Sequence, residues 1–271
     1  MTPRVKLPNR AWLLAAVAIA AIGMTPAHAE GPPAAELHVW IGNEAGDSSS
    51  VGVRSVEAAF WPTTKDRLGV RYDNSLSLDN PALARQGIDA EGYFVSYLHD
   101  FDGRFLLQGE YGQRDLANGG EQQIYKGEST FFIDGSALKF GAQVSPTAAV
   151  AGDYTDTVVW GQYNFAVSDR WRLEPALYLS ESGAAGDREW RLAGYAEYNP
   201  SDAWQLGIGA GFGQIESDIA NAGGEVFNAH ARVTFNLFEH HAIHFQVRHE
   251  DSPLQEYTAG LVGVSLRMPR G

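Results

Sequence analysis

The chain has 271 residues, with 20 lysines and arginines against 33 aspartates and glutamates, and it contains no cysteine. This acidic balance argues against nucleic acid as a partner. The lack of cysteine excludes disulfides and thiolate chemistry, so stability must come from packing and backbone hydrogen bonds.

The first 29 residues have the three parts of a secretory signal peptide. Basic residues at positions 4, 6 and 10 precede an apolar run over residues 11–22, and Ala27-His28-Ala29 supplies a cleavage site. The apolar run is too short to span a bilayer. We therefore predict a signal peptide over residues 1–29, a barrel domain over residues 30–268 and a short tail over residues 269–271. Without the three basic residues, 17 of 20 remain against 33 acids, a net charge of about −16.

Beyond residue 30 the apolar residues recur at every second position rather than with a helical period. In residues 226–237, for example, Phe227, Val233 and Phe235 share one face, while Arg232 and Thr234 share the other. Alternation of this kind predicts half-buried strands. The sequence predicts an all-β protein of about 14 strands, with 12 as an alternative, centred on Val39, Val56, Val70, Val95, Leu107, Gly127, Ala142, Val159, Leu173, Gly194, Ile208, Ala231, Phe245 and Val264.

The connections between these segments alternate between short and long. Short ones, rich in Asp, Gly, Pro and Ser, lie at residues 62–66, 100–103, 134–136, 168–169, 199–202 and 239–241, and they have the composition of hairpin turns. Longer ones are expected at residues 42–50, 79–90, 115–122, 145–155, 181–188, 214–224 and 251–256. This alternation predicts an antiparallel up-and-down barrel with its short turns at one end.

The apolar face of such a barrel is expected to point outward. A closed sheet of about 14 strands encloses a lumen too wide for side chains to fill, and lipid is the solvent that favours an apolar outer face. Aromatic residues cluster near the strand ends, as in the two aromatic belts of a transmembrane barrel. The belt at the long connections is predicted to contain Trp40, Tyr111, Tyr125, Tyr178, Trp190 and Tyr257.

On these features the whole mature chain resembles Gram-negative outer-membrane β-barrel proteins, without matching a particular subfamily. Gly263, Leu266 and Met268 resemble the last strand of such barrels, although Pro269-Arg270-Gly271 follows and no aromatic residue closes the chain. The resemblance implies outer-membrane location, periplasmic termini and extracellular long loops. It also implies contact with outer-membrane lipids, lipopolysaccharide and the barrel-assembly machinery. The segment RLGVRYDNSLSLDNP and the barrel length are also similar to barrels found with exopolysaccharide export systems.

Because successive side chains of a strand point to opposite faces, an outward apolar face assigns the polar side chains to the lumen. In all, eleven basic and seven acidic residues are assigned inward, so the wall is expected to lean positive. This favours a porin-like channel or passive transporter for small polar or anionic solutes. The alternative is a closed structural or assembly barrel, braced by ion pairs and associated with export of an exopolysaccharide. The residues proposed to line the lumen are Arg67, Arg71, Glu110, Arg114, Lys126, Glu128, Arg172, Glu174, Arg191, Glu197, Arg232, His244 and Arg248.

No motif with a catalytic mechanism occurs, and we predict no enzyme, no cofactor and no metal site. A second alternative, an outer-membrane lipid hydrolase, would rest on the run from His249 to Ser252. The histidine-rich stretch of residues 235–250 is interpreted as one hairpin. His241 and His249 would lie roughly 26 Å apart along a strand, too far for one metal site.

Overall fold

The computed structural model describes residues 32–46, 50–75, 89–116, 119–184, 186–217, 219, 223–237, 240–253 and 255–270. The predicted signal peptide and Gly271 lie outside these residues. None of the described residues belongs to a helix long and apolar enough to cross a membrane.

The described residues form fourteen strands, one at each predicted segment. Their bounds are β1 Ala35–Gly46, β2 Ser50–Phe60, β3 Asp66–Ser75, β4 Asp89–Phe101, β5 Phe105–Leu116, β6 Glu121–Ile133, β7 Ser136–Ala148, β8 Tyr154–Ser168, β9 Trp171–Ser182, β10 Asp187–Ser201, β11 Trp204–Glu216, β12 Gly224–Leu237, β13 His241–Ser252 and β14 Gln255–Met268. The predicted number of fourteen is therefore confirmed.

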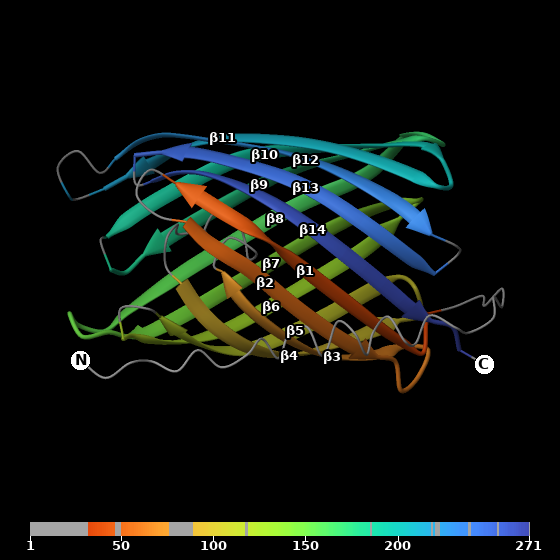
Figure 1. Cartoon of the computed structure of the whole chain (residues 1–271), viewed down its shortest axis with the longest axis horizontal. Helices are drawn as coiled ribbons and strands as arrows, with labels where there is room; N and C mark the ends of the chain where they lie inside the picture. Colours follow the sequence, from red (N-terminus) through yellow and green to blue (C-terminus); the bar gives the residue numbers. More distant parts are fainter. Residues whose placement is uncertain are drawn as a thin grey trace.

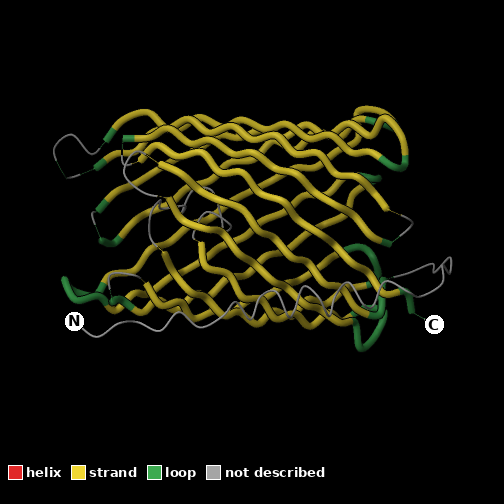
Figure 2. Tube along the Cα trace, in the orientation of Figure 1, coloured by secondary structure: helices red, strands yellow, loops and turns green. Residues whose placement is uncertain are grey.

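The strands close into one antiparallel barrel (Figure 1). Each strand pairs with its neighbours in sequence, and β1 closes the ring against β14, from Ala35 opposite Met268 to Gly46 opposite Tyr257. The strands run obliquely to the long axis of the barrel (Figure 2). Because β1 begins where β14 ends, both described termini lie at the same end, which we call the turn end. The opposite end is the loop end.

Five of the six predicted short turns are confirmed, and they lie at the turn end: residues 61–65, 102–104, 134–135, 169–170 and 202–203. The sixth prediction, at residues 239–241 between β12 and β13, falls partly outside the described residues. Asp134 and Gly135 both have positive φ, 46° and 80°. This pair of conformations is that of the two-residue turn that matches the twist of a hairpin.

Six of the seven connections at the loop end are shorter than predicted, because the strands continue into them, and the exception is the connection between β3 and β4. They span residues 47–49, 76–88, 117–120, 149–153, 183–186, 217–223 and 253–254. Asn43 and Glu44, which the sequence placed in a loop, pair in register with Gly52 and Val51. Backbone hydrogen bonds extend a ladder whether or not its side chains are apolar, so polarity alone misplaced these strand ends.

The apolar face points outward, as predicted. Ile208, Val70 and Phe212 are all more than half exposed. Of the aromatic residues predicted near the loop end, Tyr111, Tyr125 and Trp190 lie on this exposed face.

Three members of the predicted loop-end belt point inward instead, so that part of the prediction was wrong. Tyr178 and Tyr257 are buried, and Trp40 lines the interior. Proximity to a strand end suggested a belt, but alternation along the strand decides the face. Trp40 has the same parity as His38 and Glu36 on the inner face of β1.

Inward aromatic rings lie over glycines on neighbouring strands. A Cβ atom on Gly141 would lie 2.0 Å from the Trp160 ring, one on Gly263 would lie 2.6 Å from Trp40, and one on Gly112 would lie 2.2 Å from Phe94. Each aromatic residue faces its glycine directly in register, Trp160 to Gly141 for example. The missing side chain lets each ring lie close to the wall, and this pairing is a known way to stabilise glycine within a sheet.

We expect Gly141→Ala to displace Trp160 and to lower the free energy of unfolding by about 1–3 kcal/mol, the usual cost of overpacking. Urea titration in detergent micelles measures this change. Gly127→Ala is the matched control, because nothing lies within 4 Å of a Cβ atom there. Equal destabilisation by the two substitutions would show that the ring contact is not the cause.

Candidate functional site in the barrel lumen

The loop-end half of the lumen is filled by inward side chains. Val53, Ile124, Val158 and Val226 point inward there and are almost completely buried, at 0–1% exposure. The expectation that the lumen is too wide to be filled is therefore wrong for this half. The inner face is not uniformly polar, because apolar residues occupy it near the loop end.

Charged side chains in the filled half are joined in ion pairs. The carboxylate of Asp73, on β3, contacts Arg71 at 2.6 Å and Arg114, on β5, at 2.8 Å. Arg71 reaches Glu110 at 3.1 Å. The guanidinium carbon of Arg71 lies 3.9 Å from the centre of the Phe94 ring. Asp73 and Arg114 are almost completely buried, whereas Arg71 and Glu110 border the turn-end cavity, so this cluster ties β3, β4 and β5 together at the edge of the filled half.

A second buried cluster is centred on Arg191 of β10. Its guanidinium contacts Glu189 at 2.6 Å and Glu250 of β13 at 3.0 Å. β11 and β12 lie between, so β10 and β13 are separated by roughly 14 Å along the wall. The residue opposite Arg191 on β11 is Gly213, and because it has no side chain it leaves room for the arginine to extend across β11 toward β13.

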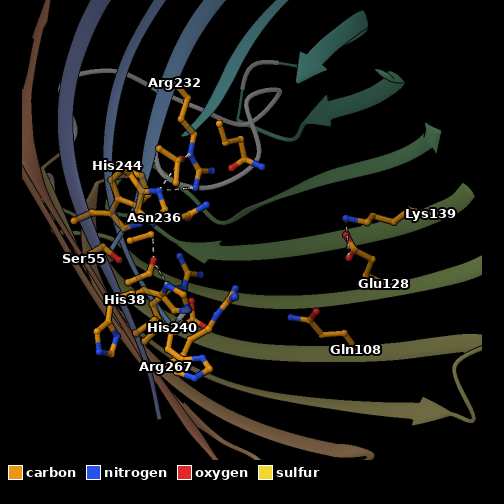
Figure 3. Close-up of a pocket in the computed structure, with 18 of the residues that line it drawn as sticks. His38, Ser55, Gln108, Glu128, Lys139, Arg232, Asn236, His240, His244 and Arg267 are labelled. Carbon is orange, nitrogen blue, oxygen red and sulfur yellow. Dashed lines mark hydrogen bonds and ion pairs between the residues drawn. The ribbon is translucent and has the colours of Figure 1, made fainter. Parts of the chain in front are cut away.

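The turn-end half encloses a cavity of about 1260 Å³. Figure 3 shows His38, His240, His244, Asn236 and Arg267 gathered on one wall, with Lys139, Glu128 and Gln108 across the cavity. Six of the thirteen residues proposed to line the lumen border this cavity: Arg71, Glu110, Lys126, Glu128, Arg232 and His244.

The other seven proposed residues lie elsewhere on the inner face. Glu174, Glu197 and Arg191 border a smaller hollow of about 320 Å³, and Arg114 belongs to the buried cluster around Asp73. Arg67 pairs with Glu57 at 2.6 Å, Arg172 donates to Asn164 at 2.9 Å, and Arg248 faces His230. The structure thus brings six of the thirteen residues to the turn-end cavity and distributes the other seven over the rest of the inner wall.

The inner wall does not lean positive. Glu44, Asp187, Glu189 and Glu250 also point inward, and the sequence had placed Glu44 and Asp187 in loops. Adding these four acids to the seven assigned from sequence gives eleven, equal to the number of basic residues assigned. The sequence predicted a positive wall because acidic residues at the strand ends, such as Glu44 and Asp187, were assigned to loops.

Most cations of the cavity are nevertheless matched by a carboxylate, and two are not. Lys139 pairs with Glu128 at 3.6 Å, and Arg267 pairs with Glu36 at 3.7 Å. In the part of the chain that the structure describes, neither Lys126 nor Arg232 has an ion pair. Each instead lies 5.7 Å from the centre of an indole ring, Lys126 at Trp160 and Arg232 at Trp40.

A chain of hydrogen bonds runs across β12, β13, β14 and β1 on the wall that holds Arg232. Arg232 Nη2 lies 3.1 Å from His244 Nδ1, and His244 Nε2 lies 2.7 Å from Ser265 Oγ. Ser265 Oγ lies 2.8 Å from His38 Nδ1, and His38 Nε2 lies 3.6 Å from Glu36. Of this chain, sequence reasoning had assigned Arg232, His244 and Glu36 to the lumen and had missed Ser265 and His38.

The hydrolase candidate does not assemble. His249 bonds Thr258 on the outer face, whereas Glu250 points inward to Arg191 and Ser252 has the parity of Glu250. A histidine and a serine on opposite faces of a strand cannot act as base and nucleophile for one substrate. Glu239 lies outside the described residues, and the described residues contain no group of three or more potential ligands that could hold a metal ion.

No protein-family model matches the chain, and no curated protein matches it by sequence. Solved structures do match its fold. A bacterial polysaccharide outer membrane secretin aligns with a TM-score of 0.61 at 13% identity, covering 88% of this chain and 100% of that one. An outer membrane channel from Pseudomonas putida F1 aligns with a TM-score of 0.54 at 10% identity, covering 90% and 99%.

The fold is that of an outer-membrane β-barrel. A monoaromatic hydrocarbon channel, CymD, adds a third example, with a TM-score of 0.56 at 8% identity over 89% of this chain and 90% of that one. Identities this low establish the architecture and leave the function to be argued from the lumen.

Proposed function

We propose that the protein is an outer-membrane channel or passive transporter for small polar or anionic solutes. The observation that carries this proposal is the polar turn-end cavity, in which Lys126 and Arg232 have no carboxylate partner among the described residues. Channels among the structures of the same fold support it.

The exposed apolar outer face suits contact with outer-membrane lipids and lipopolysaccharide, after insertion by the barrel-assembly machinery. In this orientation the turn end and both termini face the periplasm, and the loop end is extracellular.

Passage through the barrel requires the filled half to open. The ion pairs of Asp73 and of Arg191 lie between the cavity and the loop end, so we propose that solutes enter the cavity first and that these clusters control passage beyond it.

Swelling of proteoliposomes tests this function. We expect vesicles that contain the protein to swell in iso-osmotic glucose or gluconate faster than protein-free vesicles, and to show no such difference in a large dextran. A swelling rate equal to that of empty vesicles in every small solute would contradict the proposal.

A closed barrel that serves an exopolysaccharide export system is the second candidate. It is favoured by the buried loop-end half and by the similarity in fold to the polysaccharide secretin. In this case removal of the protein from cells would abolish surface polysaccharide, while proteoliposomes would not swell in small solutes.

A further inference from the structure

Arg232 is held rigidly in the cavity without being neutralised. Its Nε lies 3.3 Å from Thr234 Oγ1, its Nη2 lies 3.1 Å from His244 Nδ1, and its guanidinium carbon lies 5.7 Å from the centre of the Trp40 ring. None of these three neighbours carries a negative charge. The side chain is thus fixed in place while its positive charge stays available to a ligand.

The direction of the hydrogen bonds determines the state of His244. Arginine can only donate, so His244 Nδ1 must accept, and the ring proton lies on Nε2. That Nε2–H donates to Ser265 Oγ, whose own hydroxyl hydrogen is directed to His38 Nδ1. His38 then directs its Nε2–H toward Glu36. His244 is therefore neutral and orients Arg232 without adding a second charge.

One end of the Arg232 guanidinium remains for a ligand. Within the described residues, Nη1 makes no hydrogen bond, and Arg232 borders the 1260 Å³ cavity together with Gln205 and Asn236. A guanidinium matches the oxygens of a carboxylate or a phosphate, and amide side chains suit hydroxyl groups. Lys126 lies on β6, six strands from β12 in the ring of fourteen, and so presents its charge from a nearly opposite wall.

We propose that Arg232 is the centre of an oxyanion-binding site, and that its ligand is a small hydroxylated solute with a carboxylate or phosphate group. This proposal rests on the proposed function only in that the solute enters the cavity. Arg232 binds the oxyanion, Gln205 and Asn236 bind hydroxyl groups, and Lys126 attracts a second negative group where the solute has one.

Isothermal titration of the full chain in detergent micelles tests the site, with glucuronate and inorganic phosphate as probes and glucose as the uncharged control. We expect Arg232→Gln to weaken glucuronate binding about 10- to 100-fold, the effect of losing hydrogen bonds to a charged group. Arg267→Gln is the matched control, because it removes the same charge from the same cavity at an arginine that is already paired with Glu36. We expect a change of less than about 3-fold there, since solvent screens an exposed charge.

Arg232→Lys separates charge from geometry. It keeps the positive charge and loses the planar fork, so its affinity should fall between those of the wild type and Arg232→Gln. It also serves if Arg232→Gln fails to fold, which a heat-dependent mobility shift on a gel would show. If Arg232→Lys bound glucuronate as tightly as the wild type, the proposed role of the planar guanidinium would be contradicted.

The outcomes separate the site from the channel. Binding of both probes supports a general oxyanion site, and binding of glucuronate alone supports a carboxylate site. No binding to the folded wild type, or equal weakening by Arg232→Gln and Arg267→Gln, overturns the proposal. Binding that depends on Arg232, without vesicle swelling, would support the oxyanion site and contradict the channel function. Vesicle swelling without such binding would support the channel function and contradict the oxyanion site.

Discussion

Replacing Arg191 with methionine should lower the free energy of unfolding by about 3–5 kcal/mol, the usual cost of removing one partner from a buried ion pair. The substitution removes the guanidinium that lies between the carboxylates of Glu189 and Glu250 in a buried part of the lumen. Urea titration in detergent micelles measures the change.

Arg188→Met is the matched control on the same strand. Arg188 is largely exposed and lies 3.6 Å from Glu181, a contact whose loss should cost about 0–1 kcal/mol. A small effect at Arg191, comparable to that at Arg188, would mean that solvent reaches the cluster and that the loop-end half is open.

Asp73→Asn is expected to have an effect of similar size, again about 3–5 kcal/mol. The substitution keeps the side-chain volume but removes the negative charge that lies between Arg71 and Arg114. Arg71 retains Glu110, whereas Arg114 is left almost completely buried beside a neutral amide. The same urea titration applies.

Asp102→Asn provides the comparison for Asp73. Asp102 lies in an exposed turn and pairs with Lys65, and its positive φ of 58° is one that asparagine tolerates. Little change is expected there. The double variant Asp73→Asn with Arg114→Met should recover part of the loss, because it also removes the buried cation that has lost its contact with the Asp73 carboxylate. Destabilisation that grows in the double variant would contradict this assignment.

The fold could be predicted from sequence because two independent patterns agree. Alternation along each segment identifies the strands, and the turn residues identify one end of the barrel. Strand ends were predicted less well, since residues such as Glu44 and Asp187 are polar yet lie within the ladder with buried side chains. Nothing in their local sequence distinguishes a loop carboxylate from one that a distant residue will cover.

The site could be predicted only as a face. Parity placed Arg232 and His244 inward, and the structure brings them to 3.1 Å. Parity alone could not show that Ser265 and His38, on the last and first strands, extend the row of hydrogen bonds that begins at Arg232. Nor could parity show that Arg191 pairs with Glu250 while Arg232 pairs with no acid among the described residues, since ion pairing depends on the curvature of the closed wall.

The reversal potential in a planar bilayer under a potassium chloride gradient tests the proposed function most directly. We predict stable conductance with a mild preference for chloride, reduced in the double variant Lys126→Gln and Arg232→Gln, because these are the cavity cations without a carboxylate partner among the described residues. A silent bilayer, or a preference for potassium in the wild type, would contradict the account.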